Sequence, residues 1–504
     1  MKKKSVADQA QISPSILISK SRYLAGLRCD KLLWCTYKNK ELFPPFSKAT
    51  EGRFAQGHEV GELATRIFPG GQEAAPGKYY AEDTVPPTKV LVEKRIPIFE
   101  AGFVHGPAYA KIDILNPVGK DAWDLYEVKS TTSYSAEKHL ADVAIQKYAV
   151  EGNGIKVRNC YLMHVNNQYV RQGEVDPDAL MTTVNVTGEV NAFIDRIGGD
   201  MEYMLEVIQQ DVCPDIPVGP HCLEIRACDL YPVCWAALPE HHPVTLYAGK
   251  KLGFDLMEMG IEDLSEVGRG VYLNGKQEVQ VKAVKTGDLQ VNRHQVRAFL
   301  KELKYPLAFL DFETLGSAVP IYDGTRPYQS VPFQFSVHVV SKPGSGPAHY
   351  GFLAEGTNDP RPALLKSLKA VMPPTGSVIA YNSSFEKRVL RELADFDPTF
   401  KKWVKDVNLR MVDLLKPFSS FSVYHPDQHG SASMKAVLPA LTGFGYEGID
   451  MGGEDAGYEF IRITFEEAEK DDVRTTRTAM EEYCKLDTEG MILLVEKLRE
   501  LSGT

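Results

Sequence analysis

The sequence lacks any apolar run long enough to cross a membrane, and its opening Met-Lys-Lys-Lys is followed by polar residues and not by the apolar core of a secretory signal. We therefore expect no membrane partner and predict a cytoplasmic protein. Positive charge is also in short supply, because the formal net charge is −10. This balance argues against a protein that coats DNA without specificity, but it leaves room for a local basic surface.

Cysteine is scarce, at eight residues in 504, and in the cytoplasm we expect metal ligands or core thiols and no disulfides. Cys222, Cys228 and Cys234 have five residues between neighbours, which does not match the CxxC spacing of zinc knuckles. With the distant Cys29 they make four thiolates, which suits a cubane iron–sulfur cluster. A structural zinc ion is the alternative, and Cys213 is the rival for a ligand position.

The length and the 43% hydrophobic content predict two or three globular domains. Within the first, the run Trp123–Ser130 alternates like a half-buried strand and places Glu127 and Lys129 on one face. Asp113 lies in another strand-like run 14 residues before Glu127. Carboxylates on neighbouring strands can share a divalent metal ion, and a lysine beside them can steady a water molecule or a phosphate. A surface salt bridge is the alternative interpretation.

The surrounding segments predict a consistent order of elements. We expect helices over 17–38 and 51–68, a Gly/Pro-rich loop over 70–88, strands at about 90–99, 108–116 and 122–129, a helix over 136–152 and a strand over 158–166. Cys29 is expected inside the first helix. His58, in the second helix, is either a structural residue or a third metal ligand. Asp142, Gln146 and Tyr148 fall on the helix that follows the Glu-x-Lys strand.

This order, with Asp113 followed by Glu-x-Lys, resembles the PD-(D/E)xK nucleases. One early cysteine and three after the core resemble the iron–sulfur RecB-type nucleases, among them the CRISPR-associated Cas-four-like nucleases. The resemblance implies a restriction-endonuclease-like domain over 15–240, Mg²⁺ or Mn²⁺ on Asp113 and Glu127, Lys129 assisting the nucleophile, and a 4Fe–4S cluster on the four cysteines Cys29, Cys222, Cys228 and Cys234. That family has a Gln and a Tyr after the active site. Here Gln146 and Tyr148 are only two residues apart, so Asp142 is a candidate for the Gln position.

The middle of the chain is predicted to connect two domains. Residues 241–304 form a small helical connector, whose basic stretch over 282–304 either contacts phosphates or is a solvated helix face. An acidic stretch over 447–472 is expected to be a solvated, partly irregular insertion.

The second half carries further carboxylates at strand and helix ends. A buried apolar strand from Tyr305 ends in Asp311-Phe-Glu313, which places two carboxylates on one face. Partner strands are expected over 331–340 and 348–354, and residues 377–386 form a strand that runs into a helix. Tyr483 and Asp487 lie one turn apart on a helix.

The succession Asp-x-Glu, Asn-x-x-Phe-acid and Tyr-x-x-x-Asp resembles the DEDD exonucleases of the DnaQ type, tyrosine subclass. The resemblance implies an RNase H-like domain over 305–504, in which Tyr483 orients the attacking water and two metal ions are held by Asp311, Glu313, Glu386 and Asp487. The second motif of that family usually ends in Asp. Because this chain has Glu386 there, Asp413 is the alternative fourth ligand.

The whole chain thus resembles a bacterial family that fuses an iron–sulfur RecB-type nuclease domain to a DnaQ-like domain. We predict an α/β protein and a metal-dependent DNase with two active sites, acting in DNA repair or in defence against foreign DNA. One alternative keeps the fold but makes RNA or a nucleotide messenger the substrate. The other is a nucleic-acid-binding scaffold in which one half is inactive.

Overall fold

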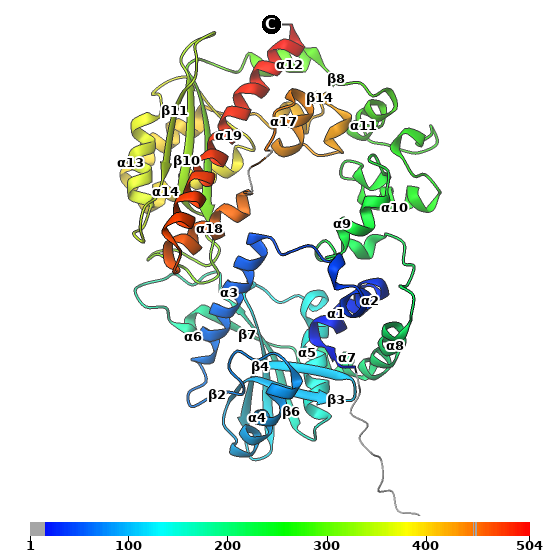
Figure 1. Ribbon diagram of the computed structural model, residues 1–504. Helices are drawn as coiled ribbons and strands as arrows, with labels where there is room; N and C mark the ends of the chain where they lie inside the picture. The colour runs from blue at the N-terminus through cyan, green and yellow to red at the C-terminus, as the bar shows by residue number, and fades with distance from the viewer. Residues whose placement is uncertain (1–15, 447, 449–450, 504) are drawn as a thin grey trace, which may run out of the picture. The chain divides into compact units, whose positions relative to one another are not determined.

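The computed structural model describes residues 16–446, 448 and 451–503, and the chain divides into two compact units (Figure 1). Among the described residues, unit 1 comprises those up to Phe46, Arg53–Trp235 and Ser317–Tyr328. Unit 2 comprises Ser47–Gly52, Ala236–Gly316 and the described residues from Gln329 onward. Both units combine sheets and helices, which confirms the predicted α/β class. None of the helices in the described chain has the length and apolar character needed to cross a bilayer.

Unit 1 is built on a seven-stranded sheet of order β2-β3-β4-β5-β6-β7, in which β1 pairs with β4 off this path. Strands β3, β4 and β5 are antiparallel neighbours, and β6 runs parallel to β5. The elements of this part of the chain are β1 (Ile18–Ser19), α1 (Lys20–Arg28), α2 (Asp30–Lys38), α3 (Lys48–Thr65), β2 (Gln72–Glu73), α4 (Ala81–Lys94), β3 (Ile98–His105), β4 (Ala108–Val118), β5 (Ala122–Lys129), α5 (Ala136–Glu151), β6 (Lys156–Val165), α6 (Pro177–Leu180), β7 (Met181–Asn185), α7 (Thr187–Phe193), α8 (Ile197–Gln209) and α9 (Tyr231–Cys234).

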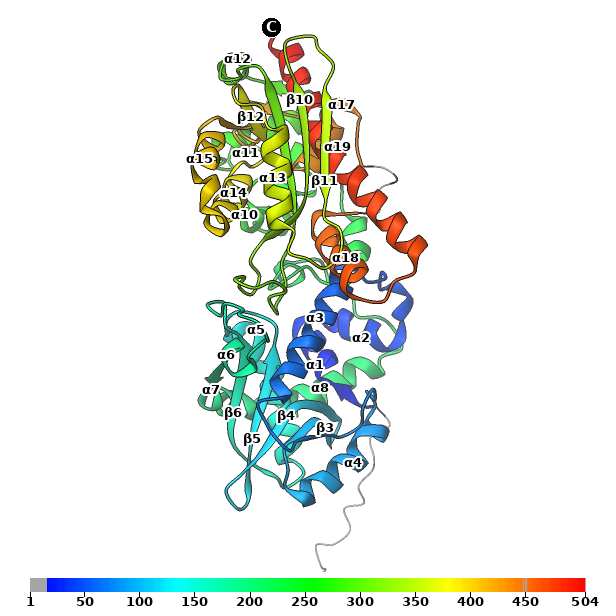
Figure 2. The same cartoon turned by 90° about the vertical axis from the view of Figure 1, so that its left-hand side faces the viewer.

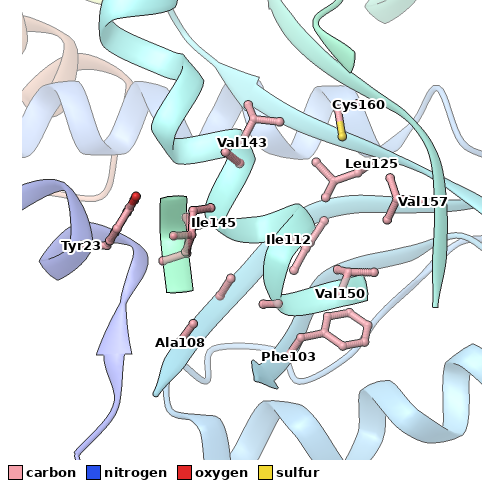
Figure 3. Close-up of a cluster of buried hydrophobic side chains, with 14 of the residues drawn as sticks. Tyr23, Phe103, Ala108, Ile112, Leu125, Val143, Ile145, Val150, Val157 and Cys160 are labelled. Carbon is pink, nitrogen blue, oxygen red and sulfur yellow. The ribbon is translucent and has the colours of Figure 1, made fainter. Parts of the chain in front are cut away.

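The crossover helix α5 is held on the sheet by apolar side chains. Figure 3 shows Val143 and Val150 of this helix beside Ile112, Leu125 and Phe103 of the strands, all of them in one buried cluster. Burying a side chain of this size stabilises the folded state by about 1.5–3 kcal/mol. The predicted strands over 108–116 and 122–129 and the predicted helix over 136–152 are confirmed.

Two predictions for the segment before β3 are wrong. Residues 81–94, expected as a loop and the start of a strand, form α4, and the strand begins only at Ile98. The Gly/Pro-rich composition favoured a loop, but tertiary contacts outweigh it. Thr84 and Thr88 are fully buried, and the Thr88 hydroxyl accepts the Gly102 N–H of β3 at 2.9 Å.

The helix predicted over 17–38 is also interrupted. Cys29 separates α1 from α2 with extended backbone angles (φ −167°, ψ 127°), so it lies at the N-terminal end of α2 and not within a helix. This break turns the first amides of α2 toward the cysteine.

Unit 2 is built on a five-stranded sheet of order β11-β10-β9-β12-β13, in which β11, β10 and β9 are antiparallel and β9, β12 and β13 are parallel. A short β14–β8 pair accompanies it. The elements here are α10 (Lys250–Glu258), α11 (Gly275–Thr286), β8 (Gln290–Val291), α12 (Arg293–Leu300), β9 (Leu307–Leu315), β10 (Val331–Val340), β11 (Ala348–Leu353), α13 (Arg361–Val371), β12 (Ser377–Ala380), α14 (Ser384–Phe396), α15 (Lys401–Leu409), β13 (Met411–Asp413), α16 (Lys416–Ser419), β14 (Val423–Tyr424), α17 (Met434–Thr442), α18 (Gly453–Phe465) and α19 (Lys470–Ser502).

Helices cover both faces of this sheet (Figures 1 and 2). One core lies between the sheet and α13, α14 and α15, and the other between the sheet and α12, α17 and α19. The strand and helix positions predicted here are confirmed for β9, β10, β11, β12, α14 and α19.

The prediction of a solvated insertion over 447–472 is wrong for its central part. Residues 453–465 form α18, whose Phe460 is buried and stacks on Phe333 with ring centroids 4.2 Å apart. Gly457 allows α18 to approach β9, because a Cβ there would lie 2.9 Å from the Thr314 carbonyl oxygen. The acidic composition of the stretch predicted a solvated segment, although α18 has a buried apolar face. Residues 447 and 449–450 lie outside the described chain.

Candidate active sites and cysteine cluster

The first carboxylate cluster forms where β4 separates from β5. The paired part of the two strands ends at Ile114 and Tyr126, and Asp113 and Glu127 are the next residues on each strand. The Val128 N–H donates to Asp113 Oδ2 at 2.7 Å, which fixes that carboxylate beside the end of β5. Glu127 is 1% exposed. The structure therefore brings together the two carboxylates predicted from the sequence.

Helix α5 contributes two more side chains to this cluster. Lys129 Nζ lies 2.5 Å from Glu127 Oε1 and 2.6 Å from Asp142 Oδ2. The Gln146 amide donates to Glu127 Oε2 at 2.5 Å, while its own Oε1 is buried with no hydrogen-bond partner among the described residues. Asp142 and Gln146 are four residues apart and so share one helix face. Tyr148 is elsewhere, with its ring 4.9 Å from that of His105.

A second lysine in the cluster was not found from the sequence. Lys20 Nζ lies 2.9 Å from Glu127 Oε1, 3.2 Å from Glu127 Oε2 and 3.2 Å from Asp142 Oδ1. It is 107 residues away from Glu127 in the chain and belongs to no local motif. His58, by contrast, is exposed on α3, and in the described chain no hydrogen bond or ion pair joins it to this cluster.

Burial and charge set the acidity of these groups. Burial, together with Asp113 and Asp142, raises the pKa of Glu127 to about 7 against the opposing effect of Lys129 and Lys20. Burial also raises the pKa of Asp113. Burial alone would raise the pKa of Asp142 too, but Lys129 and Lys20 outweigh it and hold that pKa below its usual range. Asp142 therefore acts as the permanent counter-ion of the two lysines.

Four cysteines of unit 1 line one cavity. Cys29, Cys222, Cys228 and Cys234 all contribute to its wall. Arg28, next to Cys29, is hydrogen-bonded to the segment that carries Cys222 and Cys228. Its guanidinium donates to the carbonyls of His221 at 2.9 Å and Cys222 at 2.8 Å. The cysteines that are distant in sequence are thus fixed around one space.

Backbone amides point at two of these sulfur atoms. The N–H groups of Lys31 and Leu32 donate to Cys29, and the Leu230 N–H donates to Cys228. Burial raises the pKa of both thiols, and these amides partly oppose it. Cys213 is outside this cavity wall, and its free thiol is hydrogen-bonded to the free thiol of Cys35.

The second carboxylate cluster lies in unit 2, between β9 and α19. Asp311, Glu313 and Cys484 each offer a ligand atom within 4.8 Å of the other two. The Cys484 thiol donates to Asp311 Oδ2 at 3.6 Å. The sequence motifs assign Cys484 no role in this cluster. Its position between Tyr483 and Asp487 in the sequence offered no evidence of this contact.

Two further carboxylates complete this cluster. Asp487 is 7% exposed and accepts the Tyr446 hydroxyl at 2.6 Å. Glu386, on α14, is 2% exposed, and its Oε2 is buried with no hydrogen-bond partner in the described chain. The Tyr483 ring lies 5.9 Å from that of Tyr446. Lys435 Nζ is 5.3 Å from the Tyr483 ring and is the cation that acts on Asp487.

The alternative ligand Asp413 accepts hydrogen bonds from the backbone. Its Oδ1 accepts the N–H groups of Asn382 and Leu415, both at 3.0 Å, and so it fixes the turn between β12 and α14. Of the two candidates, Glu386 is the one with a buried oxygen that has no hydrogen-bond partner in the part of the chain that the structure describes, and its charge acts on Asp311.

The carboxylates of unit 2 raise one another's pKa values. Burial first, and then Asp487 and Glu313, holds the pKa of Asp311 well above its usual range. Burial and Asp413 raise the pKa of Glu386 to about 8. Burial raises the pKa of Asp487 to about 6, against the effect of Tyr446 and Lys435. So many acids without matching cations are a destabilising arrangement, which a divalent metal ion would relieve.

The comparisons with known proteins give no information on activity. Residues 308–433 match the model of a protein family described as a domain of unknown function, DUF2779. A Mycoplasma pneumoniae protein described as an uncharacterized MG366 homolog is 24% identical over 222 residues, which cover 40% of this chain and 33% of that protein. The similarity therefore spans about a third of that relative. No solved structure matches the chain.

Proposed function

We propose that the chain is a metal-dependent nuclease with two active sites, which hydrolyses phosphodiester bonds of DNA. Unit 1 is an iron–sulfur RecB-type nuclease of the PD-(D/E)xK fold, and unit 2 is a DnaQ-like 3′–5′ exonuclease of the RNase H-like fold. The observation that carries this proposal is the convergence of buried carboxylates around Asp311 and Glu313, with an oxygen on Glu386 that has no hydrogen-bond partner among the described residues.

The topology of each sheet supports the assignment of folds. In unit 1, the antiparallel strands β3, β4 and β5 are followed by α5 and the parallel strand β6, the order expected of a PD-(D/E)xK core. In unit 2, three antiparallel strands are extended by two parallel ones, in the order β11-β10-β9-β12-β13. A mixed sheet of this kind, flanked by helices, is expected of an RNase H-like domain.

In unit 1, Asp113 and Glu127 would hold a divalent ion, which supplies an activated hydroxide and neutralises charge at the phosphorus. Gln146 orients Glu127 through its amide. Lys129 shares its ammonium between Glu127 and Asp142, so it is fixed beside the site where a water molecule or phosphate would lie.

In unit 2, the ion-binding residues would be Asp311, Glu313, Glu386 and Asp487. Tyr446 restrains Asp487, and the Cys484 thiol restrains Asp311. Burial and the neighbouring carboxylates, Asp487 first, raise the pKa of Tyr483 far above its usual range. Its hydroxyl therefore stays protonated and can donate a hydrogen bond to an oxygen at the site.

The cysteine cavity suits an iron–sulfur cluster better than zinc. Around a tetrahedral zinc ion with Zn–S bonds of about 2.3 Å, sulfur atoms lie about 3.8 Å apart. No three of the described cysteine sulfurs lie within 4.8 Å of one another. The amides that point at Cys29 and Cys228 are of the kind that stabilise cluster thiolates.

The experiment uses full-length protein purified without oxygen and 3′- or 5′-labelled single-stranded DNA, double-stranded DNA and RNA, with Mn²⁺ or with EDTA. Asp311→Asn should abolish 3′ trimming, and Glu127→Ala should abolish the remaining cleavage. Asp395→Asn, an exposed carboxylate on α14, is the control and should cleave normally. Trimming that survives Asp311→Asn would refute the assignment of unit 2, and cleavage of RNA alone would favour the alternative substrate.

The cluster has its own test. Full-length protein should be brown, with absorbance at about 400 nm as thiolate-ligated clusters show, and Cys228→Ser should bleach it. One zinc and no iron by metal analysis would replace the cluster with a structural zinc site.

A further inference from the structure

The anchoring of Lys20 in unit 1 is unusually firm for a residue near the described N-terminal end. The two residues before it, Ile18 and Ser19, pair with Ala108 and Tyr109 of β4. Ile18 is fully buried, and its N–H donates to the Pro107 carbonyl at 2.7 Å. The first residue of α1 is therefore fixed against the strand that carries Asp113.

Every oxygen of Glu127 is already occupied in this structure. Oε1 accepts from Lys129 at 2.5 Å and from Lys20 at 2.9 Å, while Oε2 accepts from Gln146 at 2.5 Å and from Lys20 at 3.2 Å. Asp113 differs, because among the described residues its only hydrogen-bond partner is the Val128 N–H. A divalent ion between Asp113 and Glu127 would have to displace one of the donors from Glu127.

Lys20 is the donor most easily displaced. Its contacts to Glu127, at 2.9 and 3.2 Å, are the longest of the set. Lys129 is two residues from Glu127 on the same strand, and Gln146 is fully buried on α5. The Lys20 side chain is 26% exposed, about as much as that of Lys129 at 27%, so its ammonium can reach solvent once it leaves Glu127. Asp142 would remain paired with Lys129.

We propose that Lys20 is a positioning residue of the first nuclease site that acts as an internal counter-ion. Its ammonium neutralises Glu127 and Asp142 when no metal is bound. Metal binding to Glu127 displaces it, and the freed ammonium then contacts a phosphate of the nucleic acid. This inference rests on the nuclease function proposed for unit 1. Removing the Lys20 charge should therefore strengthen metal binding and weaken substrate binding. A lysine with a purely structural role would not produce these opposite changes.

The test measures Mn²⁺ binding by calorimetry and DNA cleavage in full-length protein that carries Asp311→Asn to silence unit 2. Replacing Lys20 by Met removes the competing charge, so the affinity for Mn²⁺ should rise several-fold. At saturating Mn²⁺, the KM for DNA should rise about tenfold or more, because a charge-assisted hydrogen bond to a phosphate would be lost. Lys20→Arg retains the charge and should restore both quantities toward those of the parent.

Lys156→Met is the matched control, because Lys156 is 67% exposed in a loose surface pair with Asp121 and the substitution removes the same charge from the same unit. It should change neither quantity. Should Lys20→Met destabilise the fold, Lys20→Gln keeps a donor toward Glu127 and tests the same competition.

The outcomes separate the two levels of inference. If the Mn²⁺ affinity of a folded Lys20→Met or Lys20→Gln protein is unchanged or lower, Lys20 does not compete with metal and the inference is wrong. If Glu127→Gln leaves the Mn²⁺ binding and cleavage of the parent unchanged, the nuclease function of unit 1 itself fails.

Discussion

Glu386 offers the most direct test of the carboxylate cluster in unit 2. Its side chain is 2% exposed, its Oε2 has no hydrogen-bond partner in the described chain, and burial raises its pKa to about 8. A carboxyl group with a raised folded-state pKa stabilises the protein below its unfolded pKa, and this contribution is lost as the pH rises through the folded value. In metal-free protein, ionisation of Glu386 at alkaline pH should therefore be destabilising.

The magnitude follows from the shift. Between an ordinary value of 4.5 and the folded value of about 8, at 1.36 kcal/mol per pKa unit, the penalty reaches about 5 kcal/mol at pH 9. About 3 kcal/mol of it develops between pH 6 and pH 9. Glu386→Gln keeps the shape of the side chain and removes the charge. In EDTA the variant should exceed the wild type in stability, and the difference should grow from pH 6 to pH 9.

Urea denaturation of the full chain, with hydrogen exchange of α14 to assign the transition, measures this difference. Asp395→Asn on the same helix is the control and should show no comparable trend, because Asp395 is 76% exposed. Mn²⁺ at about 100 times its Kd should stabilise the wild type by about 2.7 kcal/mol and the variant by less. A variant that is no more stable than the wild type at pH 9 in EDTA would refute the picture of a buried, uncompensated acid.

Two further predictions concern stability away from the carboxylates. Arg171 donates to the carbonyls of Pro320 and Ile321, both at 2.8 Å, so Arg171→Ala should release the segment Ser317–Tyr328 and speed its proteolysis, while Arg171→Lys should restore one contact at most. Burial, with His349 and Lys485, lowers the pKa of His338 to about 4. As the pH falls, the unfolded state takes up a proton before the folded state does, so stability should fall between pH 6.5 and pH 4 by up to about 3 kcal/mol. His338→Gln should flatten this pH dependence of stability in urea titrations. A pH dependence that is unchanged in the variant would contradict the prediction.

The elements that could be predicted are those with a strong local pattern. The strand from Leu307 to Leu315 is a continuous buried run, and the strand from Ala122 to Lys129 alternates. Each carries its carboxylates within a few residues, so the motif and the element were found together. Helix α4 was missed because its stability comes from the fit of Thr84 against Gly102, where a Cβ would lie 2.2 Å from the Thr84 hydroxyl oxygen.

The parts of the sites that escaped prediction come from distant segments. Lys20 reaches Glu127 only because β1 pairs with β4, and Tyr446 reaches Asp487 from outside any motif. Ala318 and Val319 follow the Asp-x-Glu strand in sequence, yet they pack in a core of unit 1 beside Val60 and Met163. No periodicity within the segment itself specifies such a partner.

The two carboxylate clusters differ in the lysine ammonium groups that neutralise their buried charge, and this difference predicts how each responds to metal removal. In unit 1, Lys20 and Lys129 supply two ammonium groups to Glu127 and Asp142. In unit 2, Lys435 is the cation that acts on Glu313.

Buried charges without a partner are costly, whereas paired ones are tolerated. Unit 1 should therefore keep its structure in EDTA, with unchanged hydrogen exchange in β5 and α5. Exchange in β9 and α19 of unit 2 should accelerate in EDTA and slow again on addition of Mn²⁺. Equal protection of α5 and α19 with and without metal would mean that the acids of unit 2 are neutralised by protons alone, as their raised pKa values allow, and that metal binding contributes nothing to the stability of that unit.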